Sequence, residues 1–396
     1  MMRTMLRHLL AAFALTAPVA TLAAPPPASV VIAFDSESSR SLIVEGLANK
    51  ETGRRVDAND PVRIASISKL IMALTALRLV DEGKLDLERD VSDYLGWQLR
   101  SPNHPDAPVT LAHLLSHRAG LSDAAGYIIP LGESLQAKLA DPAAWRETGA
   151  PGDAAFEYAN LGSPIIATAL EAASGERYDR LVERLVFAPL GVKACLNWIG
   201  CDADMQGRAV TLYRHTGEIA ADGPDRLPPN CTIPVAEGTA CDFESYVPGT
   251  NASIFSPQGG VRIGMMDMAR IGMSLLTPED NGDEEATMLA SRFGPFRSDR
   301  DDGQEFFCAY GLAMQLIAAP HRNCLDDLFG DGRIRLGHSG EAYGLQSGLW
   351  IDPDRGEGIV YFITEAPPPL GGEDTGGFTD REKALVARAQ AMVGNE

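Results

Sequence analysis

The chain has 396 residues and a formal net charge of −20 at pH 7, with 45% hydrophobic and 22% charged residues. This length and composition allow a full hydrophobic core, in one large domain or two unequal ones, and argue against wholesale disorder. The acidic balance argues against binding to nucleic acid or to an anionic membrane, because both would repel such a surface.

The first 24 residues have the pattern of a secretory signal peptide. MMRTMLRH carries arginines, LLAAFALTAPVATLAA is apolar, and Ala23 and Ala24 suit cleavage before PPPAS. Thr16 and Pro18 interrupt the apolar run, which is already shorter than a membrane span. We therefore expect an exported protein, periplasmic or secreted, with no stable membrane anchor after cleavage.

Two strands and two helices are expected next. SVVIAFDS and SLIVEGLA are β-branched runs separated by polar turn residues, which predicts an antiparallel pair. SKLIMALTALRLVDEG predicts a helix that is apolar along one face and stops at Gly83. VTLAHLLSHRAGL (109–121) predicts a second helix, opened by Thr110 and ended near Gly120.

Helices continue through the middle of the chain. Ser163 as N-cap and Pro164 at the first helical position predict a helix that Gly175 ends. A further helix is expected at 178–187, and residues 195–250 have a loop-like, cysteine-containing sequence.

Late in the chain the hydrophobic pattern changes from a helical to a strand-like period. After a helix at 265–276, RIRLGHSG, YGLQSGLWIDP and GIVYFITE predict three strands joined by glycine-rich or Asp-Pro turns. TDREKALVARAQAMV predicts a closing helix, with Thr379 and Glu382 spaced as a capping box.

Strands near both ends with helices between them predict an α/β (α+β) fold. Its antiparallel sheet would be built from both chain ends and flanked by helices, with an inserted mainly helical region. The expected boundaries are 25–95 together with 250–396 for the sheet domain, and 96–249 for the helical domain.

Six cysteines, an even number, occur from residue 195 onward in a chain that we expect to be exported, which favours disulfides. Nearest-neighbour pairing, one of fifteen possibilities, gives 195–201, 231–241 and 308–324. The alternative is a metal site, but there is no C-x-x-C and no histidine flanks these positions, so we expect no metal.

Ser66 and Lys69 lie three residues apart in RIASISKL, at the expected start of a helix. Positions i and i+3 share a helix face, so the hydroxyl and the amine can meet. A desolvated lysine can take the proton of a serine and make it a nucleophile. The alternative is an ordinary helix start with a surface lysine, and the triplet alone does not decide.

Tyr158 and Asn160 lie in the loop before Ser163, where a rigid helix start can aim both side chains into a cleft. A nearby lysine ammonium would favour the phenolate, so that Tyr158 could relay protons between Ser66 and a leaving group. The alternative is a packed tyrosine and an asparagine in a turn.

His338, Ser339 and Gly340 come at the end of a predicted strand. A strand edge offers backbone N–H and C=O groups to an extended substrate, and a glycine permits close approach. The alternative is a simple turn between strands.

In this order, Ser-x-x-Lys, Tyr-x-Asn and His-x-Gly resemble the serine hydrolases of the class C β-lactamase and D-alanyl-D-alanine carboxypeptidase (penicillin-binding-protein-like) family. Six segments are similar to that family's characteristic segments and follow in its order: IASISKL, GKLDLERDVSDYL, VTLAHLLSHRAGL, FEYANLGS, LVFAPLGV and GHSGEAYG. Several segments in register are far more specific than any single triplet. The resemblance spans roughly residues 30 to 365 and implies a β-lactamase/DD-peptidase-like fold.

The resemblance also implies roles for individual residues. Ser66 would be the nucleophile of an acyl-enzyme, and Lys69 and Tyr158 would share the general-base and general-acid work, with the first base left open. Asn160 would orient Lys69 and hydrogen-bond the substrate amide. The backbone N–H groups of Ser66 and Glu341 would form the oxyanion hole.

His338 marks a departure, because typical β-lactamases of this group have Lys-Thr-Gly where this chain has His-Ser-Gly. The resemblance implies that His338 and Ser339 line a pocket for a substrate carboxylate. A histidine would make the positive charge there pH-dependent. Similar His-x-Gly triplets occur in carboxypeptidases and aminopeptidases acting on D-amino acids and in some esterases.

We therefore expect an exported serine hydrolase that cleaves an amide or ester, closest to a D-Ala-D-Ala carboxypeptidase or a related β-lactamase-family hydrolase. The substrate would be a small molecule or a peptidoglycan peptide, with no cofactor and no nucleic-acid partner; the oligomeric state is left open. The alternatives are an esterase of the same fold and a catalytically silent cell-wall-binding protein. The absence of G-x-S-x-G and H-E-x-x-H sequences argues against two other hydrolase classes, and His117 is expected to be structural.

Overall fold

The computed structural model describes residues 26–147, 149–224, 231–277, 289, 306–318, 326–367 and 377–393. The expected signal peptide lies outside these ranges. No helix in the described part of the chain combines the length and the apolar character that crossing a membrane requires.

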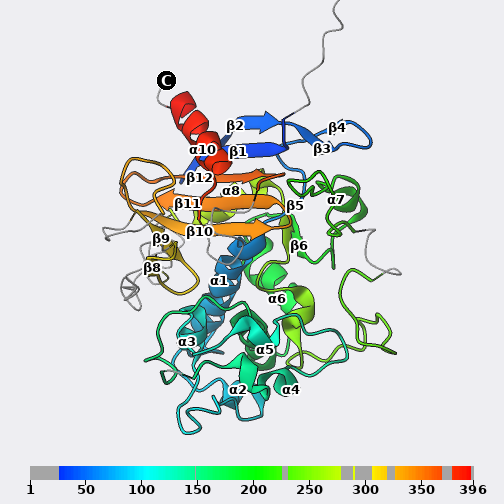
Figure 1. The fold of residues 1–396 in the computed structure, drawn as a ribbon, viewed down its shortest axis with the longest axis vertical. Helices are drawn as coiled ribbons and strands as arrows, with labels where there is room; N and C mark the ends of the chain where they lie inside the picture. Colours follow the sequence, from blue (N-terminus) through cyan, green and yellow to red (C-terminus); the bar gives the residue numbers. More distant parts are fainter. Residues whose placement is uncertain are drawn as a thin grey trace, which may run out of the picture.

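A seven-stranded antiparallel sheet forms one side of the molecule, in the order β2-β1-β12-β11-β10-β9-β8 (Figure 1). Its strands are β1 (Ser29–Asp35), β2 (Ser39–Glu45), β8 (Ala309–Tyr310), β9 (Gln315–Ile317), β10 (Arg335–Ala342), β11 (Leu345–Asp352) and β12 (Glu357–Ile363). The first strand pairs with the last along its whole length, from Ser29 opposite Ile363 to Asp35 opposite Glu357. The predicted antiparallel sheet built from both chain ends is confirmed.

Two smaller sheets lie beside it. One pairs β3 (Leu47–Asn49) with β4 (Arg54–Arg55), and the other has the order β5-β7-β6, formed by β5 (Val62–Arg63), β7 (Val261–Ile263) and β6 (Ala194–Leu196).

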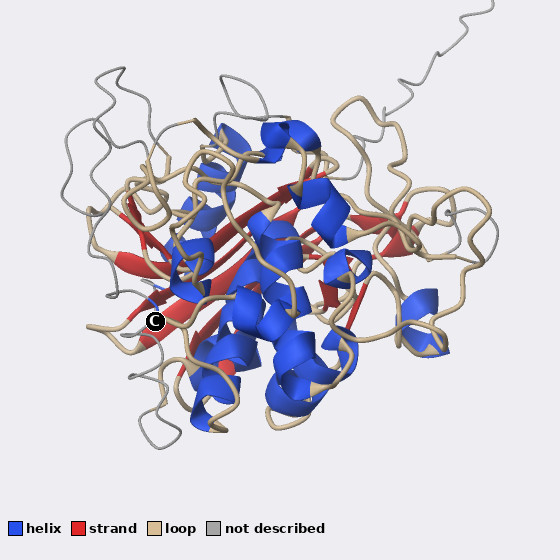
Figure 2. Ribbon diagram, turned by 90° about the horizontal axis from the view of Figure 1, so that it is seen from below, coloured by secondary structure: helices blue, strands red, loops and turns tan. Residues whose placement is uncertain are grey.

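Helices cover both faces of the main sheet and fill the other half of the molecule (Figure 2). The α-helices are α1 (Ser68–Asp81), α2 (Ser92–Leu95), α3 (Leu111–Leu115), α4 (Leu135–Leu139), α5 (Gly162–Ser174), α6 (Tyr178–Val182), α7 (Ala203–Gly207), α8 (Met265–Ser274) and α10 (Asp380–Val393). The short helical turns are η1 (Ala65–Ile67), η2 (Asp123–Ala125), η3 (Pro142–Ala144), the π-helical η4 (Glu183–Phe187) and η5 (Ala252–Phe255).

Both faces of the sheet are buried, as the alternation of side chains along β1 shows. Val30 and Ile32 point into the main core, whereas Val31 points to the opposite face, where Leu385 and Val386 of α10 pack. The predicted capping box starts α10: the Thr379 N–H donates to the Glu382 carboxylate at 3.3 Å, and the Glu382 N–H donates to the Thr379 hydroxyl at 3.2 Å.

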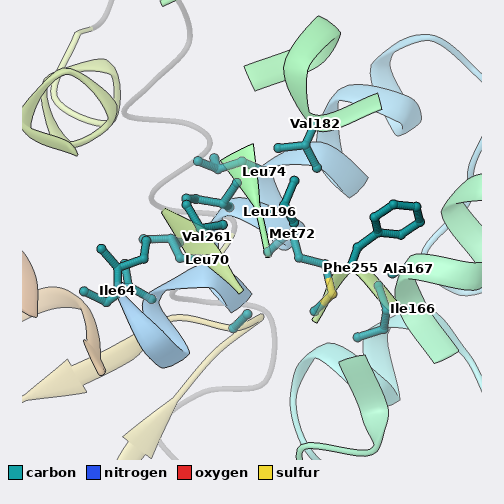
Figure 3. Close-up of a cluster of buried hydrophobic side chains, with 14 of the residues drawn as sticks. Ile64, Leu70, Met72, Leu74, Ile166, Ala167, Val182, Leu196, Phe255 and Val261 are labelled. Carbon is teal, nitrogen blue, oxygen red and sulfur yellow. The ribbon is translucent and has the colours of Figure 1, made fainter. Parts of the chain in front are cut away.

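Helix α1 runs through the main core rather than along its surface. Leu70, Met72 and Leu74 lie among Val261 and Phe255, and each is at most 1% exposed (Figure 3). The expected one-sided apolar helix is therefore buried on nearly all sides, because α5, α6 and η4 pack around it. This packing holds the N-terminus of α1 rigidly.

The expected start of α5 needs correction. Ser163 is not the N-cap: the helix begins at Gly162 and Ser163 lies inside it. The preceding N–H groups of Asn160 and Leu161 are bound instead by the Asp123 carboxylate from a separate loop, so a cap within the sequence is not needed. The predicted end at Gly175 is confirmed, with this glycine in the left-handed conformation.

The second expected helix is shorter than predicted. Thr110 does open α3 with a capping box, but the helix ends at Leu115 rather than near Gly120. The reason is local: Ser116 donates its hydroxyl back to the Ala112 carbonyl, and His117 then takes a left-handed conformation with φ of +56°.

Two of the three predicted disulfides are confirmed, Cys195–Cys201 and Cys231–Cys241. Cys308 is also disulfide-bonded. Its predicted partner, Cys324, lies outside the described residues. The expected domain boundaries stay a prediction.

The close packing of α8 against β1 predicts the effect of one substitution. A Cβ at Gly272 would lie 2.3 Å from the buried ring of Phe34. Gly272→Ala should lower the free energy of unfolding in urea by about 1–3 kcal/mol, although alanine is the better helix former. The loss should shrink in a Phe34→Leu background, where the ring is absent. A Gly272→Ala variant as stable as the wild type would contradict this packing.

Candidate active site

Ser66 lies in η1, immediately before α1, and is half-buried. The preceding Ala65 has φ of +46°, a left-handed conformation that non-glycine residues rarely adopt and that must be held by its surroundings. The Ser347 hydroxyl on β11 donates to the Ile64 carbonyl at 3.0 Å, and Gly259 packs against Ala65 from the other side. The sheet therefore fixes the turn that carries the Ser66 hydroxyl.

Gly340 permits a close approach as expected, but the group that approaches it is the backbone of Ile64 and not a substrate. A Cβ at this position would lie 2.3 Å from the Ile64 carbonyl oxygen and 2.4 Å from the Ser347 hydroxyl oxygen. The glycine thus lets β10 lie directly against η1, which places the strand beside Ser66.

Lys69 is 1% exposed, and its Nζ has three oxygen neighbours. It lies 3.0 Å from Ser66 Oγ, 2.8 Å from Asn160 Oδ1 and 3.1 Å from the Gln258 carbonyl oxygen. Both carbonyl oxygens can only accept hydrogen bonds. A neutral Lys69 amine uses its two N–H bonds on them, and its lone pair then faces the Ser66 hydroxyl.

The electrostatic surroundings of Lys69 favour this neutral form. Burial lowers the pKa of Lys69 to about 7, and the Asp123 carboxylate acts in the opposite direction. Asp123 has no direct hydrogen bond to the amine and instead accepts from Asn160 Nδ2 at 3.0 Å. Because Asn160 Nδ2 must face this carboxylate, its Oδ1 is left to face Lys69.

Tyr158 is held between two rings. Phe307 stacks on it with centroids 4.5 Å apart and planes at 8°, and His117 lies 4.5 Å away at 36°. Lys69 Nζ lies 4.7 Å from the centroid of the Tyr158 ring, a cation–π distance when the amine is protonated. The Tyr158 hydroxyl is buried and makes no hydrogen bond of normal geometry with the described residues.

The expectation of a readily ionised Tyr158 is wrong. Burial raises the pKa of the phenol, and the nearby Ser66 hydroxyl opposes that shift only in part. Desolvation of the phenolate outweighs the influence expected from the lysine. Tyr158 is therefore a neutral phenol at physiological pH.

His117 organises the Tyr158 loop, as expected of a structural residue. Its Nδ1 accepts a hydrogen bond from the Ala159 N–H at 3.2 Å, and its carbonyl accepts from the Glu157 N–H at 3.0 Å. Burial, with smaller contributions from Lys69 and His338, holds the pKa of His117 well below its ordinary value. The ring is neutral, with its proton on Nε2.

His338 has no exposed surface, and both of its ring nitrogens are occupied. Nδ1 donates to the Ser339 carbonyl at 2.5 Å, so Nε2 accepts from the Tyr310 hydroxyl at 2.9 Å. Burial, followed by the Lys69 charge, lowers the pKa of His338 to about 3. The expected pH-dependent positive charge at this position is therefore wrong, because the ring stays neutral across the physiological range.

The register of β10 determines which backbone groups face the site. The triplet does not end the strand as expected: β10 continues to Ala342, and Tyr343 and Gly344 form a turn with φ of +57° and +82°. Ala342 and Leu345 are the hydrogen-bonded pair that closes this hairpin. Bonded pairs then alternate, so the N–H groups of Ser339 and Glu341 point away from β11.

The edge of β10 toward which these groups point is covered only in part. Strand β9 pairs with β10 as far as Gly337, and the described pairing does not extend to Ser339 or Glu341. The Ser339 hydroxyl donates to Gln315 Oε1 at 3.2 Å. The predicted site residues come from four segments: Ser66 from η1, Lys69 from α1, Tyr158 and Asn160 from the loop before α5, and residues 338–341 from β10.

Some site residues have no signal in the sequence. Asp123 is a loop carboxylate like many others, and Gln258 contributes a backbone carbonyl that any residue could supply. Tyr310 and Phe307 precede the His338 triplet by about thirty residues, and only the sheet order brings them to it. Within the described residues, no group of three metal-ligating side chains comes together.

The chain is similar to several known proteins. A family model described as Beta-lactamase matches residues 19–378. Penicillin-binding protein 4 of Amycolatopsis lactamdurans is 24% identical over 361 residues, covering 91% of this chain and 85% of that protein. D-alanyl-D-alanine-carboxypeptidase/endopeptidase AmpH of Escherichia coli K12 is 31% identical over 147 residues, covering 35% of this chain and 37% of that protein.

A solved structure shows the same fold. The class C beta lactamase from Rhodobacter sphaeroides superposes with a TM-score of 0.61 at 19% identity, covering 93% of this chain and 95% of that one. At this identity the likeness concerns the fold alone.

The neutral state of His338 can be measured directly. In ¹⁵N NMR spectra of histidine-labelled protein, the signal lost in His338→Gln should not titrate between pH 5 and pH 8, because its pKa is about 3. In the urea-denatured protein all histidines should titrate near 6.5. A midpoint for His338 above pH 6 in the folded protein would show that a charged ring is tolerated there.

Proposed function

Because this chain belongs to the beta-lactamase family and is a serine hydrolase of that family, we propose that it forms an acyl-enzyme on Ser66 and cleaves an amide or ester bond. The observation that carries this proposal is the 3.0 Å contact between Lys69 Nζ and Ser66 Oγ, in a site where burial lowers the pKa of the lysine to about 7. A serine needs such a base to become a nucleophile.

Lys69 is the base of the first step. Its N–H bonds are directed to Asn160 Oδ1 and the Gln258 carbonyl, so the lone pair of the neutral amine faces the Ser66 proton. As Ser66 Oγ forms a bond to the substrate carbonyl carbon, its proton passes to Lys69.

Tyr158 donates its phenolic proton to the leaving group. As a neutral phenol with a raised pKa it keeps its proton until a basic atom approaches, and among the described residues its hydroxyl makes no hydrogen bond of normal geometry. When the carbon–nitrogen or carbon–oxygen bond breaks, the leaving atom takes the phenolic proton. Lys69 then returns the serine proton to Tyr158, and a water molecule hydrolyses the acyl-enzyme by the reverse sequence.

The negative oxygen that develops on the substrate carbonyl is stabilised by the N–H groups of Ser66 and Glu341. The direction of the Glu341 N–H, away from β11, supports this assignment. Preorganised donors of this kind typically lower a barrier by about 3 kcal/mol.

The substrate we propose is a D-Ala-D-Ala-type peptide of the cell wall. The part of the β10 edge beyond its pairing with β9 can hold an extended peptide by backbone hydrogen bonds, and His338, Ser339 and Gly340 shape this edge. The names of the two relatives point to the same class. An exported protein would meet such a substrate, and the disulfides suit an oxidising compartment, periplasmic or extracellular.

Active-site labelling tests the nucleophile. A fluorescent fluorophosphonate should label the wild-type protein and should not label Ser66→Ala, because the Lys69 amine lies at hydrogen-bond distance from the Ser66 hydroxyl and can take its proton. Ser68→Ala is the matched control: this buried serine lies in the same turn, where its hydroxyl accepts from the Val261 N–H at 3.2 Å. Labelling should survive in that variant, and an unlabelled wild type would count against catalysis and for a silent binding protein.

A second candidate, an esterase acting on uncharged substrates, is favoured by one observation. His338 is neutral and buried, so it offers no charge to a substrate carboxylate. A pocket without that cation gives no advantage to a leaving group that ends in a free carboxylate.

Matched substrates separate the two candidates. If the esterase is correct, the methyl ester of acetyl-D-alanyl-D-lactate should be cleaved with kcat/KM about tenfold or more above that of the free acid. Both substrates contain the same alanyl–lactate ester bond, and the rate is measured by release of acetyl-D-alanine, so hydrolysis of the methyl ester does not count as cleavage. A preference for the free acid, together with cleavage of acetyl-D-Ala-D-Ala, would favour the carboxypeptidase.

A further inference from the structure

We propose that Asp123 is a positioning residue of this site: it fixes the orientation of Asn160 and stabilises the protonated form of Lys69, and so sets the pH at which the base becomes active. This inference rests on the proposed function, in which Lys69 is the base.

The geometry shows a carboxylate whose two oxygens are both directed at the Asn160 segment. Oδ2 accepts from the Asn160 N–H at 2.9 Å and from Asn160 Nδ2 at 3.0 Å, and Oδ1 accepts from the Leu161 N–H at 2.9 Å. These are the N–H groups that precede the first turn of α5 and that the helix itself leaves unpaired. Asp123, the first residue of η2, thus binds the chain immediately before α5 and holds the Asn160 amide with its oxygen toward Lys69.

Asp123 is itself anchored from the other side. The Ser122 N–H donates to the Ala144 carbonyl at 2.9 Å, and the Ser122 hydroxyl accepts from the Ala124 N–H at 3.2 Å. The loop is therefore tied to η3, independently of α5. A carboxylate held in this way can resist rotation of the Asn160 amide, which a free surface side chain could not do.

Asp123 is the charged group that raises the pKa of Lys69, because the other titratable groups beside the amine are neutral. Among the described residues, the other titratable groups around the amine are His117 from the turn after α3, His338 from β10 and the Tyr158 phenol, and all three are neutral. Asp123 is the described carboxylate that acts on Lys69, and it opposes the effect of burial on the pKa of the lysine. Without it, desolvation would act unopposed.

The experiment compares the pH dependence of phosphonylation by a fluorophosphonate in three variants. In the wild type, the rate should rise through about pH 7 as Lys69 loses its proton. In Asp123→Asn the carboxylate is gone, the protonated amine is less stable, and this rise should move to lower pH by about one unit. The plateau rate should also fall about tenfold, because Asn160 is no longer held.

Two variants serve as controls. Asp123→Glu keeps the charge, so its rise should stay near that of the wild type even if the plateau rate falls. Asp141→Asn removes an exposed carboxylate that accepts from the Ala143 N–H at 2.9 Å at the start of η3 and does not contact Asn160. It should keep both its stability and its pH profile, because asparagine caps a helix about as well as aspartate does.

A second measurement does not depend on catalysis. The chain has six lysines, so the ¹³Cε signal of Lys69 can be assigned by its loss in Lys69→Met and titrated by NMR. Its midpoint should fall in Asp123→Asn and not in Asp141→Asn. An unchanged Lys69 midpoint in Asp123→Asn would overturn the inference. A wild type that is not labelled at all would instead overturn the proposed function, while the NMR titration would still decide the role of Asp123.

Discussion

The site depends on the burial of the Lys69 amine, which is energetically unfavourable for its charged form. Removal of Lys69 from water destabilises its ammonium form strongly enough to bring the pKa to about 7. The three oxygens around Nζ make this burial possible, because they satisfy either protonation state. A lysine with the same spacing from Ser66 on the surface would remain charged and could not act as a base.

Parts of the chain that are far apart supply what this buried amine needs. The core around α1 fixes Lys69, and the sheet fixes Ser66 through contacts of Ile64 with Gly340 and Ser347. The missing Cβ at Gly340 is what allows β10 and η1 to touch. The Asn160 segment closes the site from the helical side, where Asp123 binds the N–H groups before α5. The contacts from the sheet and the contact from the Asn160 segment therefore meet around Ser66 and Lys69.

Around the amine the protein places groups that do not change charge at physiological pH. His117 and His338 are buried with their acceptor nitrogens occupied, one by a backbone N–H and the other by the Tyr310 hydroxyl. Tyr158 stays a phenol between two rings. Lys69 is therefore the group near the nucleophile whose protonation changes close to neutral pH. In the mechanism that we propose, this arrangement separates the base, Lys69, from the acid, Tyr158.

The sequence by itself determined the pairing of Ser66 with Lys69, the presence of Tyr158, Asn160 and the His338 triplet, and a sheet built from both chain ends. These features follow from local spacing, period-two patterns and motif order. Only the tertiary structure decided the ionisation of the site, because a pKa depends on burial and on neighbours that are remote in sequence. For that reason the expected charge on His338 and the easy ionisation of Tyr158 were wrong. Asp123 and the Gln258 carbonyl carry no local pattern, so their places beside Asn160 and Lys69 emerge only when the chain has folded.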